Sequence, residues 1–119
     1  MLTEISTYLK NQDTDIFLGL MPDQPDNCVA LFEYAGSPPD LHWNGEYPGL
    51  QVRVRDKSYA AGRAKIGHIM RVLHGLTETV LGSTRYLLIR ARGTPEILKR
   101  DASNRVEFFV NFEIIKERD

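Results

Sequence analysis

Side chains with the chemistry for catalysis or metal binding are sparse in this 119-residue sequence. It holds three histidines, and none stands in a recognised metal-binding pattern. His68 and His74 are six residues apart, whereas two ligands on one face of a helix need a spacing of three or four. His42 stands alone in a stretch rich in proline and glycine. We therefore expect surface or capping roles for all three histidines, and no bound metal.

Motifs of enzyme active sites are also missing. The glycines form neither a GxGxxG nor a Walker pattern, and no nucleophile stands at a recognised spacing from a base. Cys28 is the single cysteine and lies in an apolar run, which predicts a small buried thiol rather than a reactive one. The sequence predicts that the protein is not an enzyme and uses no cofactor.

Charge and composition narrow the class of partners. Fifteen basic and sixteen acidic residues give a formal net charge of −1, which argues against general affinity for nucleic acid. The first residues lack a basic segment followed by an apolar one, and no apolar run approaches the ~20 residues that cross a bilayer. We expect one folded domain over residues 1–119, neither secreted nor inserted in a membrane, with no sequence-specific nucleic-acid partner.

Four arginines form the most distinctive polar pattern. Arg53 and Arg55 share one face of a predicted strand, and Arg90 and Arg92 repeat the arrangement on another. In one interpretation this face is solvated and its charge is neutralised by nearby glutamates, namely Glu33, Glu107 and Glu113. In the other, the face lies against a partner, because the planar guanidinium binds carboxylates in a bidentate manner. The pattern alone fits both interpretations.

The central unit of the chain must position these arginines. Residues 50–55 alternate between apolar and polar side chains, as a half-buried strand requires. A helix is predicted to begin near Ser58 and to end at Gly75, since its apolar residues recur with a period of 3.6. This unit supplies one face of a sheet and the helix that covers it.

The other segments predict a second helix and three more strands. A short helix is expected over residues 2–11, a polar loop over residues 11–15, and strands over residues 28–34, 86–92 and 106–115. Residues 36–49 are expected to form a crossing loop pinned by Trp43, and residues 76–82 a connector or a second helical piece. The apolar patch at residues 16–21 fits a strand and a helical turn equally well, and residues 97–104 are polar and charged.

Together these segments predict an α+β domain in the order αββαββ. Its sheet would have four strands, mainly antiparallel, with the main helix packed on one face. The expected core consists of Leu31, Val52, Val54, Ile66, Ile69, Leu73, Leu87, Ile89, Val106, Phe108, Val110 and Phe112.

Several short stretches resemble a known family when their order and spacing are taken together. These are YPGLQVRVR at residues 47–55 with Tyr59, then Tyr86 with Pro95, and KRDASNR at residues 99–105 leading into FFVNF at residues 108–112. Over residues 28–115 the chain is similar to the minor capsid or tail-terminator proteins, which join head and tail in long-tailed bacteriophages.

The resemblance implies a structural protein of the virion, made in the host cytoplasm and placed at the head–tail junction. Its copies would form a hexameric ring that caps the head-proximal end of the tail tube, ends tube growth, and contacts the tail tube protein and the head connector or stopper. It also implies that the turn between Asp101 and Arg105 shapes a subunit contact. The predicted interface residues are Arg53, Arg55, Asp101, Arg105 and Trp43.

Two alternatives remain open from the sequence. One is a cellular module that binds RNA or peptide on its sheet, although no RNP1-like run is present. The other is a different phage neck protein, such as a connector-completion or stopper protein. A ring former would reach about six copies, whereas a binding module would stay monomeric.

Overall fold

The computed structural model describes residues 1–10 and 15–118. The described chain forms two helices and seven strands: α1 (Leu2–Leu9), β1 (Ile16–Leu18), β2 (Cys28–Ser37), β3 (Gly45–Asp56), α2 (Tyr59–Leu73), β4 (Leu76–Leu81), β5 (Thr84–Ala91), β6 (Glu96–Arg100) and β7 (Val106–Glu117).

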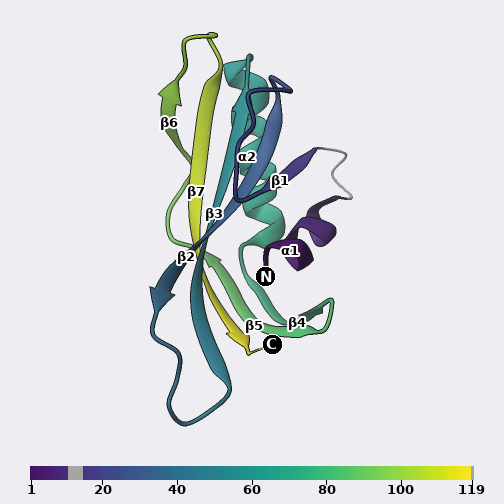
Figure 1. The fold of residues 1–119 in the computed structure, drawn as a ribbon, viewed down its shortest axis with the longest axis vertical. Helices are drawn as coiled ribbons and strands as arrows, with labels where there is room; N and C mark the ends of the chain where they lie inside the picture. The colour runs from purple at the N-terminus through teal and green to yellow at the C-terminus, as the bar shows by residue number, and fades with distance from the viewer. Residues whose placement is uncertain (11–14, 119) are drawn as a thin grey trace.

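All seven strands belong to one twisted sheet, in which six follow the order β1-β2-β3-β7-β5-β4 and β6 pairs with β7 outside this path (Figure 1). β1 runs parallel to β2, and the other neighbours are antiparallel. β7 is the central strand, because it pairs with β3 along one edge and with β6 and then β5 along the other. The molecule is elongated, with extents of 49 × 25 × 22 Å, and the β2–β3 and β6–β7 hairpins lie at opposite ends of its long axis (Figure 1).

Helix α2 covers one face of this sheet. Ser58 caps its first turn by accepting a hydrogen bond from the backbone N–H of Ala61 at 3.1 Å. Gly62 and Ile66 are buried against the strands, and a Cβ atom added at Gly62 would lie 2.8 Å from the ring of Phe108. The helix therefore approaches β7 as closely as it does because residue 62 has no side chain.

The predicted fold class was wrong. The protein is mostly β, with seven strands in a curled mixed sheet, and it is not an αββαββ domain with four antiparallel strands. The predicted helices and strands do occur, so the difference arises from the elements that the sequence pattern did not reveal. These are β1, β4 and β6.

Exposure explains why β4 and β6 were missed, whereas residues 16–21, which contain β1, were left open between a strand and a helical turn. All five residues of β6 are exposed, and only Leu81 of β4 is buried, so neither strand shows an alternating apolar pattern. Both strands depend on backbone pairing, of β6 with β7 and of β4 with β5, which leaves little trace in side-chain composition. β1 has only three residues, too few for a period to be recognised.

The predicted crossing loop at residues 36–49 is mostly the end of a long hairpin. β2 continues to Ser37, β3 begins at Gly45, and the two strands pair directly across a register shift between Tyr34 and Ser37. Gly36 adopts a φ of +62°, and a Cβ atom there would lie 2.1 Å from the backbone oxygen of Tyr47. Glycine and proline thus mark an irregularity within the hairpin rather than its end.

The predicted core is confirmed except at one position. Eleven of the twelve predicted residues are buried, whereas Leu87 is only half-buried. The pairing of β5 with β7 shifts register between Tyr86 and Leu88, which turns Tyr86 inward. The Tyr86 hydroxyl donates a hydrogen bond of 2.7 Å to Glu4 of α1.

The predictions for the beginning of the chain are confirmed in part. Helix α1 is present, with Ile5 and Leu9 buried, and the thiol of Cys28 is buried as expected. Burial raises the pKa of this thiol. Most of the predicted polar loop, residues 11–14, lies outside the described residues. None of the helices in the described part of the chain has the length and apolar character needed to cross a membrane.

Candidate functional site

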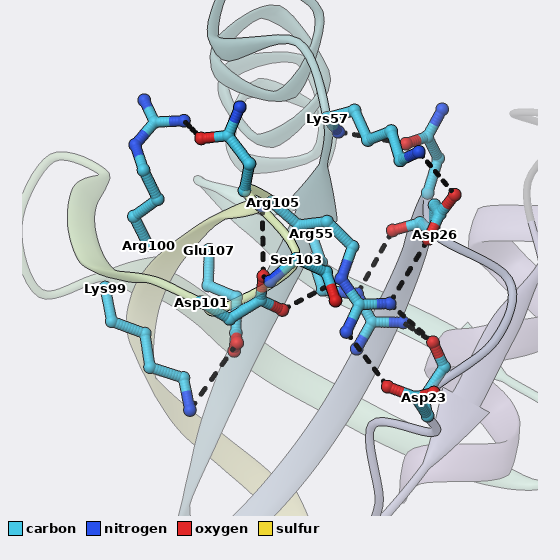
Figure 2. Close-up of polar contacts among 12 residues, drawn as sticks. Asp23, Asp26, Arg55, Lys57, Lys99, Arg100, Asp101, Ser103, Arg105 and Glu107 are labelled. Carbon is cyan, nitrogen blue, oxygen red and sulfur yellow. Dashed lines mark hydrogen bonds and ion pairs between the residues drawn. The ribbon is translucent and has the colours of Figure 1, made fainter.

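Two buried arginines hold the proline-containing loop at residues 22–26 against the sheet (Figure 2). Arg55, on β3, is 4% exposed. Its Nη2 atom donates to the backbone oxygens of Pro22 at 2.6 Å, Pro25 at 2.7 Å and Asp23 at 3.2 Å, and its Nε donates to that of Asp26 at 3.1 Å. Backbone oxygens rather than glutamates therefore compensate the charge of this guanidinium, and the loop at residues 22–26 covers it.

Arg105 approaches the same loop from the turn before β7. It is 4% exposed and forms ion pairs with Asp101 at 2.8 Å, Asp23 at 3.0 Å and Asp26 at 3.3 Å. Figure 2 shows that Arg55 and Arg105 both point toward the loop. We call Arg55, Arg105, Asp101, Asp23 and Asp26 the arginine clamp. It ties loop 22–26 to the β6–β7 turn, across more than 70 residues of sequence.

Asp101 organises the turn that carries Arg105. Its Oδ1 atom accepts hydrogen bonds from the backbone N–H groups of Ser103 and Arg105, each at 3.0 Å. These donors, with the Arg105 backbone N–H contributing most and its guanidinium adding to it, hold the pKa of Asp101 below its ordinary value. The pKa of Asp26 is also lowered, chiefly by its hydrogen bond with Lys57.

The clamp predicts a specific loss of stability in acid. A carboxyl group whose pKa is lower in the folded state stabilises the fold above its ordinary pKa of 3.8, and this contribution disappears as the pH falls through the folded value. We expect the midpoint of urea unfolding to decrease below about pH 4. Asp101→Asn should flatten this dependence, because an amide does not titrate. Equal slopes for the variant and the wild type between about pH 5 and pH 2.5 would contradict the assignment.

Trp43 lies at the tip of the β2–β3 hairpin, far along the long axis from the clamp (Figure 1). Its indole N–H donates to the hydroxyl of Tyr47 at 3.2 Å, and a Cβ atom added at Gly45 would lie within 2.1 Å of its ring. The Trp43 side chain is 39% exposed, and its neighbour Leu41 is 93% exposed. The tip therefore presents two large apolar side chains.

Asp40 keeps this tip in one conformation. It accepts hydrogen bonds from the backbone N–H of His42 at 2.8 Å and from the hydroxyl of Tyr47 at 3.0 Å, and the first of these donors lowers the pKa of Asp40 most. Arg118, beyond β7, donates to the backbone oxygen of Asp40 at 2.6 Å. A tip ordered in this way loses little entropy on binding a partner.

Arg53 lies on the sheet face opposite α2, two residues before Arg55. Its guanidinium carbon is 4.6 Å from the centre of the Phe32 ring, and its Nε donates to Gln51 at 2.6 Å. The structure thus brings Arg55, Arg105 and Asp101 together, whereas Arg53 and Trp43 lie apart from them. The interface role of all five residues stays a prediction.

Several residues around Arg53 were missed by sequence reasoning. Phe32 and Tyr34 stand at alternate positions of β2, on the same face as Arg53, and Arg92 completes the group from the end of β5. The alternation of two aromatic residues in β2 was the available signal. It was not recognised because residues 28–34 were interpreted only as a strand, without assigning a role to the face that carries Phe32 and Tyr34.

The described residues contain no group of three or more histidine, cysteine, aspartate or glutamate side chains that could hold a metal ion. His74 lies at the end of α2, where its Nδ1 accepts a hydrogen bond of 2.9 Å from the backbone N–H of Ala91. His74 is also the C-cap residue of α2, because its backbone N–H donates to the backbone oxygen of Met70 at 2.8 Å, while its side chain joins the end of the helix to β5.

Comparison with known proteins identifies the family. The model of the family described as "Bacteriophage tail terminator protein" matches residues 8–118. A solved structure described as "Virion of native gene transfer agent (GTA) particle" contains a chain of similar fold, with a TM-score of 0.70 and 14% identity over 96% of this chain and 84% of that one. No curated protein matches the sequence. The chain therefore belongs to the bacteriophage tail terminator protein family and is a structural component of a phage virion, as the sequence resemblance indicated.

Proposed function

We propose that this protein forms a ring of six copies that caps the head-proximal end of the tail tube, ends tube growth and joins the tail to the head. The observation that carries the proposal is the match of the tail terminator family over residues 8–118, which is nearly the whole chain. The proposed role is mechanical and needs neither a catalytic group nor a cofactor.

The shape of the subunit supports a closed ring. Two different projections, the β2–β3 tip with Trp43 and the β6–β7 turn with Asp101 and Arg105, occupy opposite ends of a molecule 49 Å long (Figure 1). Contacts between unlike surfaces generate rings when the rotation closes. In this arrangement Arg55 would act indirectly, because it holds the loop at residues 22–26 and is itself enclosed by that loop.

Light scattering after gel filtration tests the assembly. The purified protein, alone or mixed with tail tubes of its phage, is expected to form particles of about six copies. In a phage from which its gene is deleted, tails should be overlong or headless, and the wild-type gene should restore normal tails. A protein that stays monomeric with tail tubes present, together with tails of normal length in the deletion phage, would disprove the proposal.

Trp43→Ala is expected to reduce the number of joined particles by at least about tenfold, since buried tryptophans at interfaces contribute a large share of binding energy. Its melting temperature should change little, because the contacts of the Trp43 side chain with Tyr47 and Gly45 lie within the hairpin tip. Tail lengths and joined heads are counted by electron microscopy in a complementation assay. Val80→Ala serves as the control, because Val80 is 64% exposed on β4. Equal yields for the two variants would exclude Trp43 from the contact.

A further inference from the structure

The sheet face opposite α2 carries an open hollow of about 650 Å³. It lies across β2, β3 and β7 and reaches the end of β5. Its lining combines aromatic, amide and charged side chains: Phe32, Glu33, Tyr34, Gln51, Arg53, Arg92 and Asn111. A metal site does not account for this combination, because the described residues contain no group of side chains that could hold a metal ion.

Arg53 is held in position by its neighbours. It stacks over Phe32 at 4.6 Å, and its Nε donates to Oε1 of Gln51 at 2.6 Å. Gln51 is oriented in turn, because its Nε2 donates to Oδ1 of Asn111 at 3.0 Å. The two terminal nitrogens of Arg53 have no partner among the described residues. The guanidinium is therefore fixed while its bidentate edge is available.

Arg92 adds a second unpaired cation to the hollow. Its backbone N–H donates to the oxygen of Asn111 at 2.8 Å, which fixes its main chain, and its exposed side chain pairs with no carboxylate in the described chain. The neighbouring Arg90, in contrast, is paired with Glu113. Glu33 is the one acidic residue in the lining, so the hollow has an excess of positive charge.

We propose that this hollow binds a carboxylate side chain on an extended segment of a different virion protein. The fixed edge of Arg53 would hold the carboxylate in a bidentate manner, with Arg92 as a second donor, and the rings of Phe32 and Tyr34 would contact the adjoining aliphatic carbons. The identification of the partner as a virion protein rests on the proposed function, whereas the preference for a carboxylate rests on these side chains.

Four carboxylates on the described hairpin tip, loop 22–26 and β6–β7 turn are already engaged, which argues against their entering the hollow of a second copy. Asp40 is held within the hairpin tip, and Asp23, Asp26 and Asp101 are held by Arg105. Nucleic acid is disfavoured as well, because phosphate binding depends on many cations and the lining of the hollow offers two beside a glutamate. A carboxylate supplied by another protein fits the available charge.

The test uses the full ¹⁵N-labelled protein and the pentapeptide acetyl-Thr-Glu-Val-Glu-Thr-amide, with its glutamine analogue as the paired probe. We expect the acidic peptide to shift the Nε–H signal of Arg53 and the side-chain amide signals of Gln51 and Asn111. The variant Arg53→Gln/Arg92→Gln should bind it at least about tenfold more weakly. Arg71→Gln is the matched control, since Arg71 is an exposed arginine on α2, outside the lining of the hollow.

Four results would overturn the proposal: equal binding of the glutamine analogue, unchanged binding by the double variant, no binding up to about 10 mM peptide, or binding of a dT12 oligonucleotide at the same signals. Self-association abolished by the double variant would assign the hollow to a second copy instead. Tail capping is measured separately in the complementation assay. If the peptide binds but the protein does not cap tails, the proposed function is disproved and the binding site is not. If the protein caps tails but does not bind the peptide, the binding site is disproved and the proposed function is not.

Discussion

Replacing Phe108 by alanine is expected to lower the free energy of unfolding by about 3–5 kcal/mol, the usual cost of truncating a fully buried phenylalanine. Phe108 is 0% exposed on the central strand β7, where its ring lies 5.5 Å from that of Tyr59 and contacts the helix at Gly62. The cavity would lie between the sheet and helix α2. Urea unfolding monitored by circular dichroism measures the loss.

The control for this variant is the next residue of the same strand. Phe109 is only half-buried and faces the opposite side of the sheet, so Phe109→Ala should cost about 1 kcal/mol or less. This pair compares the same substitution on the two faces of β7. A loss below about 1 kcal/mol for Phe108→Ala, or a similar loss for both variants, would contradict the assignment of the inward face.

Arg55→Met is expected to destabilise the protein by about 3 kcal/mol, because it removes a charged donor from four backbone oxygens. Each such hydrogen bond contributes about 1.5–3 kcal/mol when the acceptor stays buried. The released loop would recover part of this free energy, because its carbonyl groups would form hydrogen bonds with water. Methionine keeps most of the side-chain volume, so the loss reflects hydrogen bonding rather than packing.

Arg53→Met provides the comparison, two residues away on the same face of β3. Its guanidinium has one hydrogen bond and one ring contact, so we expect a loss of at most about 1 kcal/mol. Limited proteolysis should also cut residues 22–26 faster in Arg55→Met than in Arg53→Met. The same stability for the two variants, or an unchanged rate of cleavage, would show that Arg55 does not hold the loop.

These two arginines show how far the sequence predicts a site. Both occupy outward positions of the same alternating strand, and nothing in the local pattern distinguishes them. Their environments differ because a loop about 30 residues earlier in the chain covers Arg55 and leaves Arg53 accessible. The periodicity of a strand does not report tertiary contacts of this kind. The sequence therefore predicted that both arginines lie on the polar face of β3, but not that one is buried and the other accessible.

The same limit applies to the fold: elements with a periodic pattern of apolar side chains were predicted, and elements without one were not. Helix α2 and strand β7 were predicted because one face of each is buried, which imposes periods of 3.6 and 2 on their side chains. β6 escaped prediction because all of its residues are exposed and its stability comes from backbone hydrogen bonds to β7. Asp101 and Arg105 were predicted as residues of one turn, yet the sequence did not reveal that Asp23 and Asp26 complete the clamp around Arg105.

The central position of β7 has a consequence for synthesis on the ribosome. This strand is translated after every other strand, yet it alone joins β1–β3 to β4–β5 and also pairs with β6. Until it emerges, the nascent chain holds two separate groups of strands with open edges, and such edges invite pairing with other chains. Most of the native contacts that β7 makes are distant in sequence, which slows folding. A chain that stalls before residue 106 would therefore be a source of aggregates rather than a partly active subunit.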